Sequence, residues 1–177
     1  MKKFPVVFTL LIVIVACSSY AQGQAQSESS INNIRRQYAA INKRSSRFKK
    51  VKKELAGFSL EGGQLIAYLD GPAVVKLVAT HYGEMGRASE EYYYSNGKLI
   101  FVFEKVSHYN KPMSAKVVHT MESRYYFDND QLIRLIDENG KQLDPSSEEF
   151  RSKQKELLET SNLFVAGARS KNPTIEK

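Results

Sequence analysis

Three histidines, His81, His108 and His119, are the side chains of this chain best suited to proton transfer or metal binding near neutral pH. They lie far apart in the sequence. His81 and His119 fall in segments that we predict to be strands, where they could approach each other beside Glu90 or Glu122. A histidine held next to a carboxylate would define a hydrolytic site. One function to consider is therefore that of a small hydrolase with a site formed by a histidine and a carboxylate.

The motifs that carry chemistry in common enzyme classes are missing from the sequence. It has no Gly-x-Ser-x-Gly elbow, phosphate-binding loop, zinc-binding helix motif or dinucleotide fingerprint. The acidic stretches 128–130 and 137–140 resemble fragments of a calcium loop without its full spacing, and both have the composition of turns. We therefore predict no catalytic residue, no metal site and no cofactor.

Aromatic and basic side chains are plentiful enough to form a binding surface. The formal net charge is +7, and a basic segment reaches from Arg35 to Lys53 with no acidic residue before Glu54. A surface of this sign favours an anionic lipid, a glycan or an acidic envelope protein. The candidate binding residues are three tyrosines and three cations: Tyr68, Tyr93, Tyr126, Arg44, Arg47 and Lys50.

The first 21 residues have the pattern of a bacterial export signal. Lys2 and Lys3 supply a positive start, an apolar run follows over 6–16, and small residues precede a cleavage point after Ala21. The run is too short to remain as a membrane-spanning helix. We predict a periplasmic or secreted protein. Export argues against a nucleic-acid partner, and no motif of stacking aromatics accompanies the basic segment.

The same apolar run supports a second interpretation. Residues 14–17, Ile-Val-Ala-Cys, resemble the lipobox of bacterial lipoproteins, in which the cysteine becomes the acylated N-terminus, although lipoboxes usually carry Leu at the first of these positions. The resemblance implies lipidation at Cys17 and a protein anchored to the envelope. Cleavage after Ala21 instead implies a soluble protein that begins at Gln22. Both interpretations stay open.

Cys17 is the only cysteine, so the mature chain has no disulfide under either interpretation. About 150 mature residues must then be stabilised by a hydrophobic core, and that length suits one domain. No later apolar segment is long enough to span a bilayer, so we expect no transmembrane helix in the mature protein. The predicted organisation is a signal over 1–21, a flexible leader over 22–30, a domain over 31–169 and a frayed tail over 170–177.

Helices are predicted at both ends of the domain. In the basic segment, apolar residues recur at helical spacing from Ile31 to Ile41, and the stripe continues, with a bend or a break after residue 46, until Gly57. The second helix follows Asp144 and Pro145, has an apolar side and runs to about residue 169.

The middle of the chain contains an internal repeat of a strand, a two-residue turn and a second strand. The three copies cover residues 58–70, 92–104 and 125–137. Each turn is a dipeptide suited to positive φ, namely Gly62-Gly63, Asn96-Gly97 and Asn129-Asp130. We add a strand over 74–82, and 117–121 leads into the third hairpin. The predicted fold class is α+β: a single antiparallel meander sheet of about seven strands, flanked by an N-terminal basic helical segment and a C-terminal amphipathic helix.

Two-residue turns fix the register, and alternation then assigns the faces. Tyr94 should lie opposite Leu99, and Tyr92 opposite Phe101. The predicted core face carries Phe58, Leu60, Leu65, Leu69, Tyr92, Tyr94, Leu99, Phe101, Phe103, Tyr125, Phe127, Leu132 and Ile136. The other face carries Tyr68, Tyr93, Ile100, Val102, Tyr126, Ile133 and Leu135. These are too many to leave bare, and we expect a helix to cover them, with a ligand as the alternative.

The stretch Glu-Tyr-Tyr-Tyr-Ser-Asn-Gly-Lys-Leu over 91–99 resembles the hairpin unit of MORN-type repeat proteins, in which aromatic strands flank an Asn-Gly turn. The chain lacks the regular glycines and the shorter period of those repeats. The resemblance implies a binding or scaffolding surface rather than catalysis. We expect a non-catalytic envelope module that uses its aromatic sheet face, its basic segment or both. The alternatives are a small exported hydrolase and a structural subunit of an envelope assembly.

Overall fold

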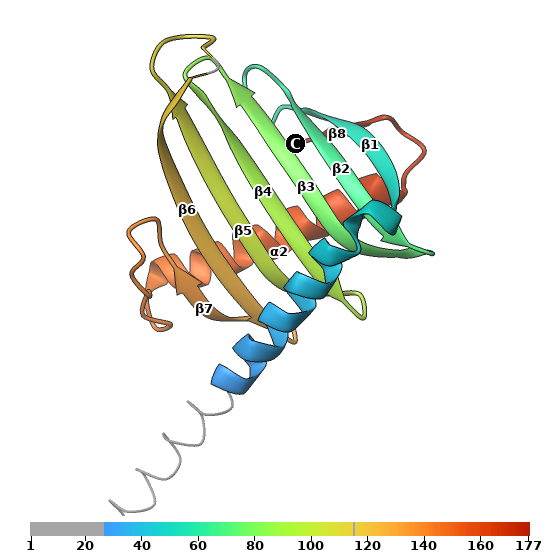
Figure 1. The fold of residues 1–177 in the computed structure, drawn as a ribbon, viewed down its shortest axis with the longest axis vertical. Helices are drawn as coiled ribbons and strands as arrows, with labels where there is room; N and C mark the ends of the chain where they lie inside the picture. The colour runs from blue at the N-terminus through green and yellow to red at the C-terminus, as the bar shows by residue number, and fades with distance from the viewer. Residues whose placement is uncertain (1–26, 115) are drawn as a thin grey trace, which may run out of the picture.

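A computed structural model describes residues 27–114 and 116–177, so the predicted signal, the lipobox and Cys17 lie outside the described residues. An eight-stranded sheet occupies the centre in the order β7-β6-β5-β4-β3-β2-β1-β8 (Figure 1). The strands are β1 (Lys49–Ala56), β2 (Gly63–Asp70), β3 (Ala73–Gly83), β4 (Gly86–Ser95), β5 (Lys98–Tyr109), β6 (Val117–Asp128), β7 (Gln131–Ile136) and β8 (Thr174–Glu176). Neighbours from β1 to β7 are antiparallel, whereas β8 runs parallel to β1.

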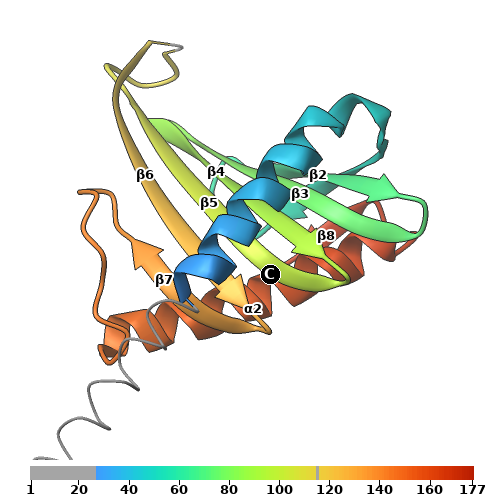
Figure 2. The ribbon, with the colours of Figure 1, turned by 60° about the horizontal axis from the view of Figure 1, so that its bottom comes forward.

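One helix lies on each face of the sheet, as Figures 1 and 2 show from two directions. The N-terminal helix covers residues 27–43 and crosses one face, which we call the front face. The helix α2 (Glu148–Arg169) crosses the opposite, back face. Ser147 caps α2 by accepting a hydrogen bond from the Phe150 amide, and two glutamates in its first turn suit the positive end of the helix dipole.

The α+β class and the antiparallel meander are confirmed, but the sheet has eight strands rather than about seven, and one pair is parallel. The main error concerns the basic segment, which does not stay helical to Gly57. Its helix ends at residue 43, a short 3-10 helix η1 (Ser45–Arg47) follows, and β1 begins at Lys49. The helical prediction followed the apolar residues alone and missed the two-residue alternation of this stretch.

Lys53 explains how a lysine-rich stretch can form an inner strand. Along β1, Val51, Lys53 and Leu55 point to the back face, and the side chain of Lys53 is buried. Its ammonium group donates hydrogen bonds to the carbonyl oxygens of Ser170, at 2.7 Å, and Asn172. Carbonyls at the C-terminal end of a helix carry partial negative charge, so α2 supplies the partner that a buried cation needs.

The C-terminal tail was predicted to be frayed, and this prediction is wrong. Residues 174–176 form β8 beside β1, and Ile175 is buried against α2. The approach is so close that a Cβ atom at Gly167 would lie 2.3 Å from the Ile175 Cδ1 atom. Glycine at this position therefore lets the tail fold back under the helix.

The first predicted hairpin is also wrong. Phe58 and Leu60 lie in the loop between β1 and β2, and Leu60 is fully exposed. The true counterpart of the other two hairpins is the β2–β3 connection, which turns through Gly71 and Pro72. The other two turns form as predicted, with positive φ at both central residues of Asn96-Gly97 and Asn129-Asp130.

All three hairpins share a β-bulge that the sequence prediction did not include. Just after each turn one residue has no partner on the opposite strand: Val75, Ile100 or Ile133. Tyr94 therefore lies opposite Leu99 as predicted, but Phe101 lies opposite Tyr93 rather than Tyr92. A bulge adds one residue to one strand. Every later side chain on that strand therefore lies on the opposite face from the one that strict alternation predicts.

The bulges redistribute the apolar side chains between the two faces. Phe101, Phe103 and Ile136, predicted for the core face, lie on the front face, whereas Val102 and Leu135 lie in the back core. The back core joins α2 to the sheet through Phe150, Leu157 and Phe164 of the helix and Tyr92, Tyr94, Val102, Tyr125 and Phe127 of the strands. The front core joins Ile31 and Ile34 of the N-terminal helix to Tyr93, Ile100, Phe101 and Tyr126. The expectation that a helix covers this second face is confirmed.

The buried ion–carbonyl contact of Lys53 makes a testable contribution to stability. We expect Lys53→Met to lower the free energy of unfolding by about 2 kcal/mol, because two carbonyls lose a charged donor. Urea unfolding of the purified protein measures this change. Lys52→Met on the exposed side of the same strand is the matched control and should stay within about 0.5 kcal/mol of the wild type. Equal stability of both variants would contradict the assigned role of Lys53.

Candidate functional site

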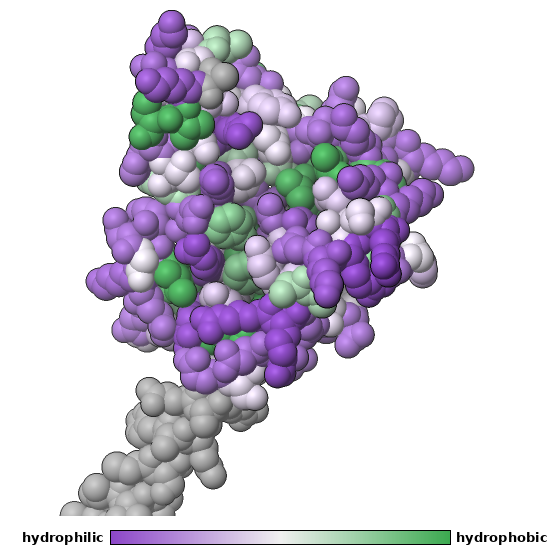
Figure 3. Space-filling model, in the orientation of Figure 1, coloured by the Kyte–Doolittle hydropathy of each residue, from purple (hydrophilic) through white to green (hydrophobic). Residues whose placement is uncertain are grey.

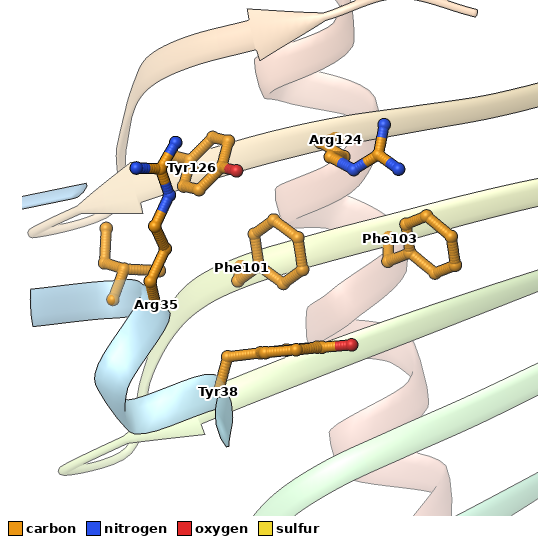
Figure 4. A pocket seen from close by; sticks show the side chains of 7 residues that line it. Arg35, Tyr38, Phe101, Phe103, Arg124 and Tyr126 are labelled. Carbon is orange, nitrogen blue, oxygen red and sulfur yellow. The ribbon is translucent and has the colours of Figure 1, made fainter. Parts of the chain in front are cut away.

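A hollow of about 210 Å³ opens on the front face where the N-terminal helix leaves the sheet uncovered. We call it the front pocket (Figure 4). The N-terminal helix, β5 and β6 each contribute to its wall. Its lining residues are Ile34, Arg35, Tyr38, Phe101, Phe103, Arg124 and Tyr126.

Aromatic rings hold one another in place along the floor of the front pocket. The ring centroids of Tyr38 and Phe101 are 5.3 Å apart with nearly perpendicular planes, and those of Phe101 and Tyr126 are 5.0 Å apart. Distances and angles of this kind are favourable for aromatic pairs. Phe103, one step further along β5, is only partly buried because the helix does not reach it. The floor is therefore apolar, ordered and open at one end.

Two arginines flank this floor, and Figure 4 shows them on either side of Phe101. The guanidinium of Arg35 lies 5.9 Å from the centroid of the Tyr126 ring. The guanidinium of Arg124 lies 5.4 Å from the centroid of the Phe103 ring. Stacking on a ring leaves the N–H groups of arginine available to an acceptor in the plane of the guanidinium.

The charges around the front pocket leave it with a positive excess. Arg124 donates a hydrogen bond to Glu122 at 2.8 Å, and Lys105 lies 3.8 Å from the same carboxylate. One negative charge is thus shared by two cations. Within residues 27–114 and 116–177, Arg35 has no carboxylate within 4.0 Å and makes only a long hydrogen bond of 3.4 Å to the Asn32 side chain.

The three predicted binding tyrosines have different surroundings. Tyr126 is buried and lines the front pocket. Tyr93 is fully buried beneath the helix, where its hydroxyl donates to Glu91. Burial, reinforced by this hydrogen bond, raises the pKa of Tyr93 far above its usual value, so the hydroxyl remains a donor. Tyr68 lies outside the pocket, between Lys50 and Lys76, whose ammonium groups are 5.3 and 5.9 Å from its ring.

The three predicted binding cations lie together at one corner of the front face and not at the front pocket. Arg44, Arg47 and Lys50 are all exposed. Arg44 forms an ion pair of 2.8 Å with Asp70 and stacks on the Phe48 ring. The structure therefore separates the predicted binding residues into a pocket, a buried position and a basic corner.

The histidines do not converge. His81 lies on β3 and His119 on β6, with β4 and β5 between them, so the prediction that they approach each other is wrong. His119 instead lies opposite His108, with ring centroids 6.0 Å apart. Among the described residues, no three His, Cys, Asp or Glu side chains are close enough to hold a metal ion.

His81 does meet one of the carboxylates named from the sequence. Its Nε2 atom lies 3.5 Å from a Glu90 oxygen, and Glu90 also accepts a hydrogen bond from the Tyr92 hydroxyl. Burial by itself would raise the pKa of Glu90, but the hydrogen bonds from His81 and Tyr92 outweigh it and the pKa lies below its usual value of 4.5. The Nδ1 atom of His81 is buried without a hydrogen-bond partner in the described structure.

Comparison with models of protein families, with curated proteins and with solved structures finds no match to this chain. In the part of the chain that the structure describes, no helix combines the length and apolarity needed to cross a membrane. The fold and the side chains of the front pocket are thus the evidence from which a function can be proposed.

The front pocket contains six residues that were not among the predicted binding residues: Ile34, Arg35, Tyr38, Phe101, Phe103 and Arg124. Strict alternation placed Phe101 and Phe103 on the core face, and only the bulge at Ile100 moves them to the front. Arg35 belongs to the basic segment, and helical spacing from Ile34 and Tyr38 could have placed it at the edge of the apolar stripe.

The lowered pKa of Glu90 predicts a pH dependence of stability. A carboxyl group with a folded-state pKa below its unfolded value adds stability above pH 4.5, and that stability is lost as the pH falls through the folded value. We expect Glu90→Gln to lose less stability than the wild type between about pH 5 and pH 3. Thermal unfolding of both proteins across this pH range measures the change in stability. Glu159→Gln, on the exposed side of α2, should follow the wild-type curve.

Proposed function

We propose that the protein is a non-catalytic binding module whose front pocket holds a small amphipathic anion, with an apolar chain or ring on the aromatic floor and an acidic group between the arginines. The observation that carries this proposal is the flanking of the ordered aromatic floor by Arg35 and Arg124. Guanidinium groups bind carboxylates and phosphates by paired hydrogen bonds, and such bonds are stronger than those between neutral groups.

The dimensions of the front pocket limit the size of this ligand. Its 210 Å³ is smaller than the usual range for pockets that enclose a drug-sized molecule. A short acyl chain or a single ring fits better than a complete phospholipid. Export, predicted from residues 1–21, would place the module where such amphiphiles meet the bacterial envelope, and the absence of familiar catalytic motifs agrees with binding rather than turnover.

Decanoate tests the proposed ligand class. We expect it to bind the purified protein in titration calorimetry, whereas decyltrimethylammonium, which has the same chain and the opposite charge, should not. Arg124→Gln should weaken decanoate binding by about tenfold, since a charge-assisted hydrogen bond is lost. Arg87→Gln is the matched control, because Arg87 is an exposed arginine on the neighbouring β4 and lies outside the front pocket.

Two results would contradict the proposed function. One is equal binding of the anionic and the cationic amphiphile, which would mean that the arginines do not select charge. The other is unchanged decanoate binding by two single variants, Arg124→Gln and Phe103→Ala. Phe103→Ala removes part of the aromatic floor without touching a fully buried side chain.

A hydrolase is the second candidate function because His81 contacts Glu90 through Nε2, although Nδ1, the nitrogen left to act on a substrate, is buried in this structure. A histidine oriented by a carboxylate is the usual arrangement for a general base, which contributes at least about a hundredfold to rate. If purified protein hydrolyses an ester or phosphoester, we expect His81→Gln to lower the rate by that factor and His119→Gln to leave it unchanged. Hydrolysis that is unaffected by His81→Gln would exclude this site.

A further inference from the structure

The two helices that cover the sheet differ in charge. Residues 27–53, which form the N-terminal helix, η1 and the start of β1, contain nine lysines and arginines and one acid, Glu28. The helix α2 contains four basic and four acidic residues. The two helices lie on opposite faces (Figures 1 and 2), so most of the positive charge of this segment lies at the front, whereas Lys53 points to the back core.

Exposed cations of the front lie on the N-terminal helix, η1 and the start of β1. On the N-terminal helix, Arg36 and Lys43 lie on the side opposite Ile31 and Ile34, which pack into the front core. Figure 3 shows strongly hydrophilic residues, in dark purple, over the helix and at the corner next to it. We define the basic surface by its exposed members: Arg36, Lys43, Arg47, Lys50 and Lys52.

Three acids near the basic surface are already paired with other cations, whereas Glu54, exposed on β1 two residues from Lys52, forms no ion pair in the described residues. Glu28 accepts a hydrogen bond from Arg134. Asp70 binds Arg44, and Glu91 forms an ion pair of 2.7 Å with Lys76. In contrast, the five members of the basic surface have no carboxylate within 4.0 Å in the described part of the chain. Their charge therefore remains available to an external partner.

We infer that the basic surface docks the protein on a bilayer that contains anionic phospholipids. Arg36 and Lys43 are about 10 Å apart along the helix axis, and the other cations lie on η1 and the adjoining strand, so they do not converge on one ligand group. An extended array of negative charges matches this arrangement, and each cation near an anionic membrane strengthens binding by about fivefold. The inference goes beyond the front pocket, because docking needs no ligand in it.

Vesicle co-sedimentation tests the inference with residues 22–177, a range that contains every element described above and lacks Cys17. We expect the protein to bind vesicles in which about one third of the lipid is phosphatidylglycerol, and not vesicles of phosphatidylcholine alone. Binding should fall steeply as the salt concentration is raised from about 0.1 M to 0.5 M, because added ions screen exposed charges.

A front variant and a matched back variant locate the docking surface. The front variant replaces four members of the basic surface: Arg36→Gln, Lys43→Gln, Arg47→Gln and Lys52→Gln. The back variant removes four exposed cations from α2 and the chain that follows it: Arg151→Gln, Lys155→Gln, Arg169→Gln and Lys171→Gln. Both variants lose the same charge, but we expect only the front variant to lose vesicle affinity. Four cations at about fivefold each predict a loss of about 600-fold.

The two variants distinguish docking through the basic surface from a general attraction between a cationic protein and an anionic membrane. Equal losses of affinity would show that net charge alone attracts the protein, and would overturn the inference. Failure to bind anionic vesicles would overturn it too, even if the protein bound nucleic acid or an acidic protein. Unfolding by urea verifies that both variants are folded. The Arg124→Gln variant should bind vesicles like the wild type, because Arg124 lies outside the basic surface. Vesicle binding and decanoate binding therefore test the two proposals separately.

Discussion

Three consecutive tyrosines in the middle of the sheet impose the constraint on which the structure depends. Tyr92, Tyr93 and Tyr94 are all buried, yet neighbouring residues of a strand point to opposite faces. Large aromatic side chains must therefore be covered on both sides of β4. The α2 helix covers Tyr92 and Tyr94, and the N-terminal helix covers Tyr93. Burial of all three rings therefore requires a helix on each face of the sheet, because a single helix can cover only one face.

The polar atoms of these tyrosines are also accommodated, which keeps their burial favourable. Tyr92 and Tyr93 donate to the carboxylates of Glu90 and Glu91, and the hydroxyl of Tyr94 is hydrogen-bonded to Ser161 of α2 at 2.8 Å. A buried hydroxyl without a partner would cost free energy. Each carboxylate in turn meets a second group, since His81 lies beside Glu90 and a lysine beside Glu91. Hydrogen bonds and ion pairs thus connect the buried tyrosines to the polar groups around the core.

The N-terminal helix connects the front core, the front pocket and the basic surface. Its inner side contributes Ile31 and Ile34 to the core, and its edge places Arg35 at the pocket. Its outer side presents Arg36 and Lys43 to solvent. Three neighbouring positions, 34 to 36, therefore serve three different environments, because successive residues of a helix are separated by about 100° around its axis. The pocket exists because this helix covers the front face only in part.

The sequence by itself determined the α+β class, the meander, the turns at Asn96 and Asn129 and the concentration of positive charge near the N-terminus. These features depend on local patterns: the period of apolar residues, the dipeptides that accept positive φ, and the order of charges along the chain. Export and lipidation at Cys17 remain predictions from the same kind of pattern, because these residues lie outside the described part of the chain.

Only the tertiary structure decided which side chains form the front pocket. The bulge at Ile100 moves Phe101 and Phe103 to the front, and a bulge is fixed by pairing with neighbouring strands rather than by any single residue. The strand at Lys53 and the ordered tail likewise depend on contacts between segments more than a hundred residues apart. Local patterns do not encode such contacts, because a buried lysine is favourable only when a distant helix end supplies its hydrogen-bond acceptors.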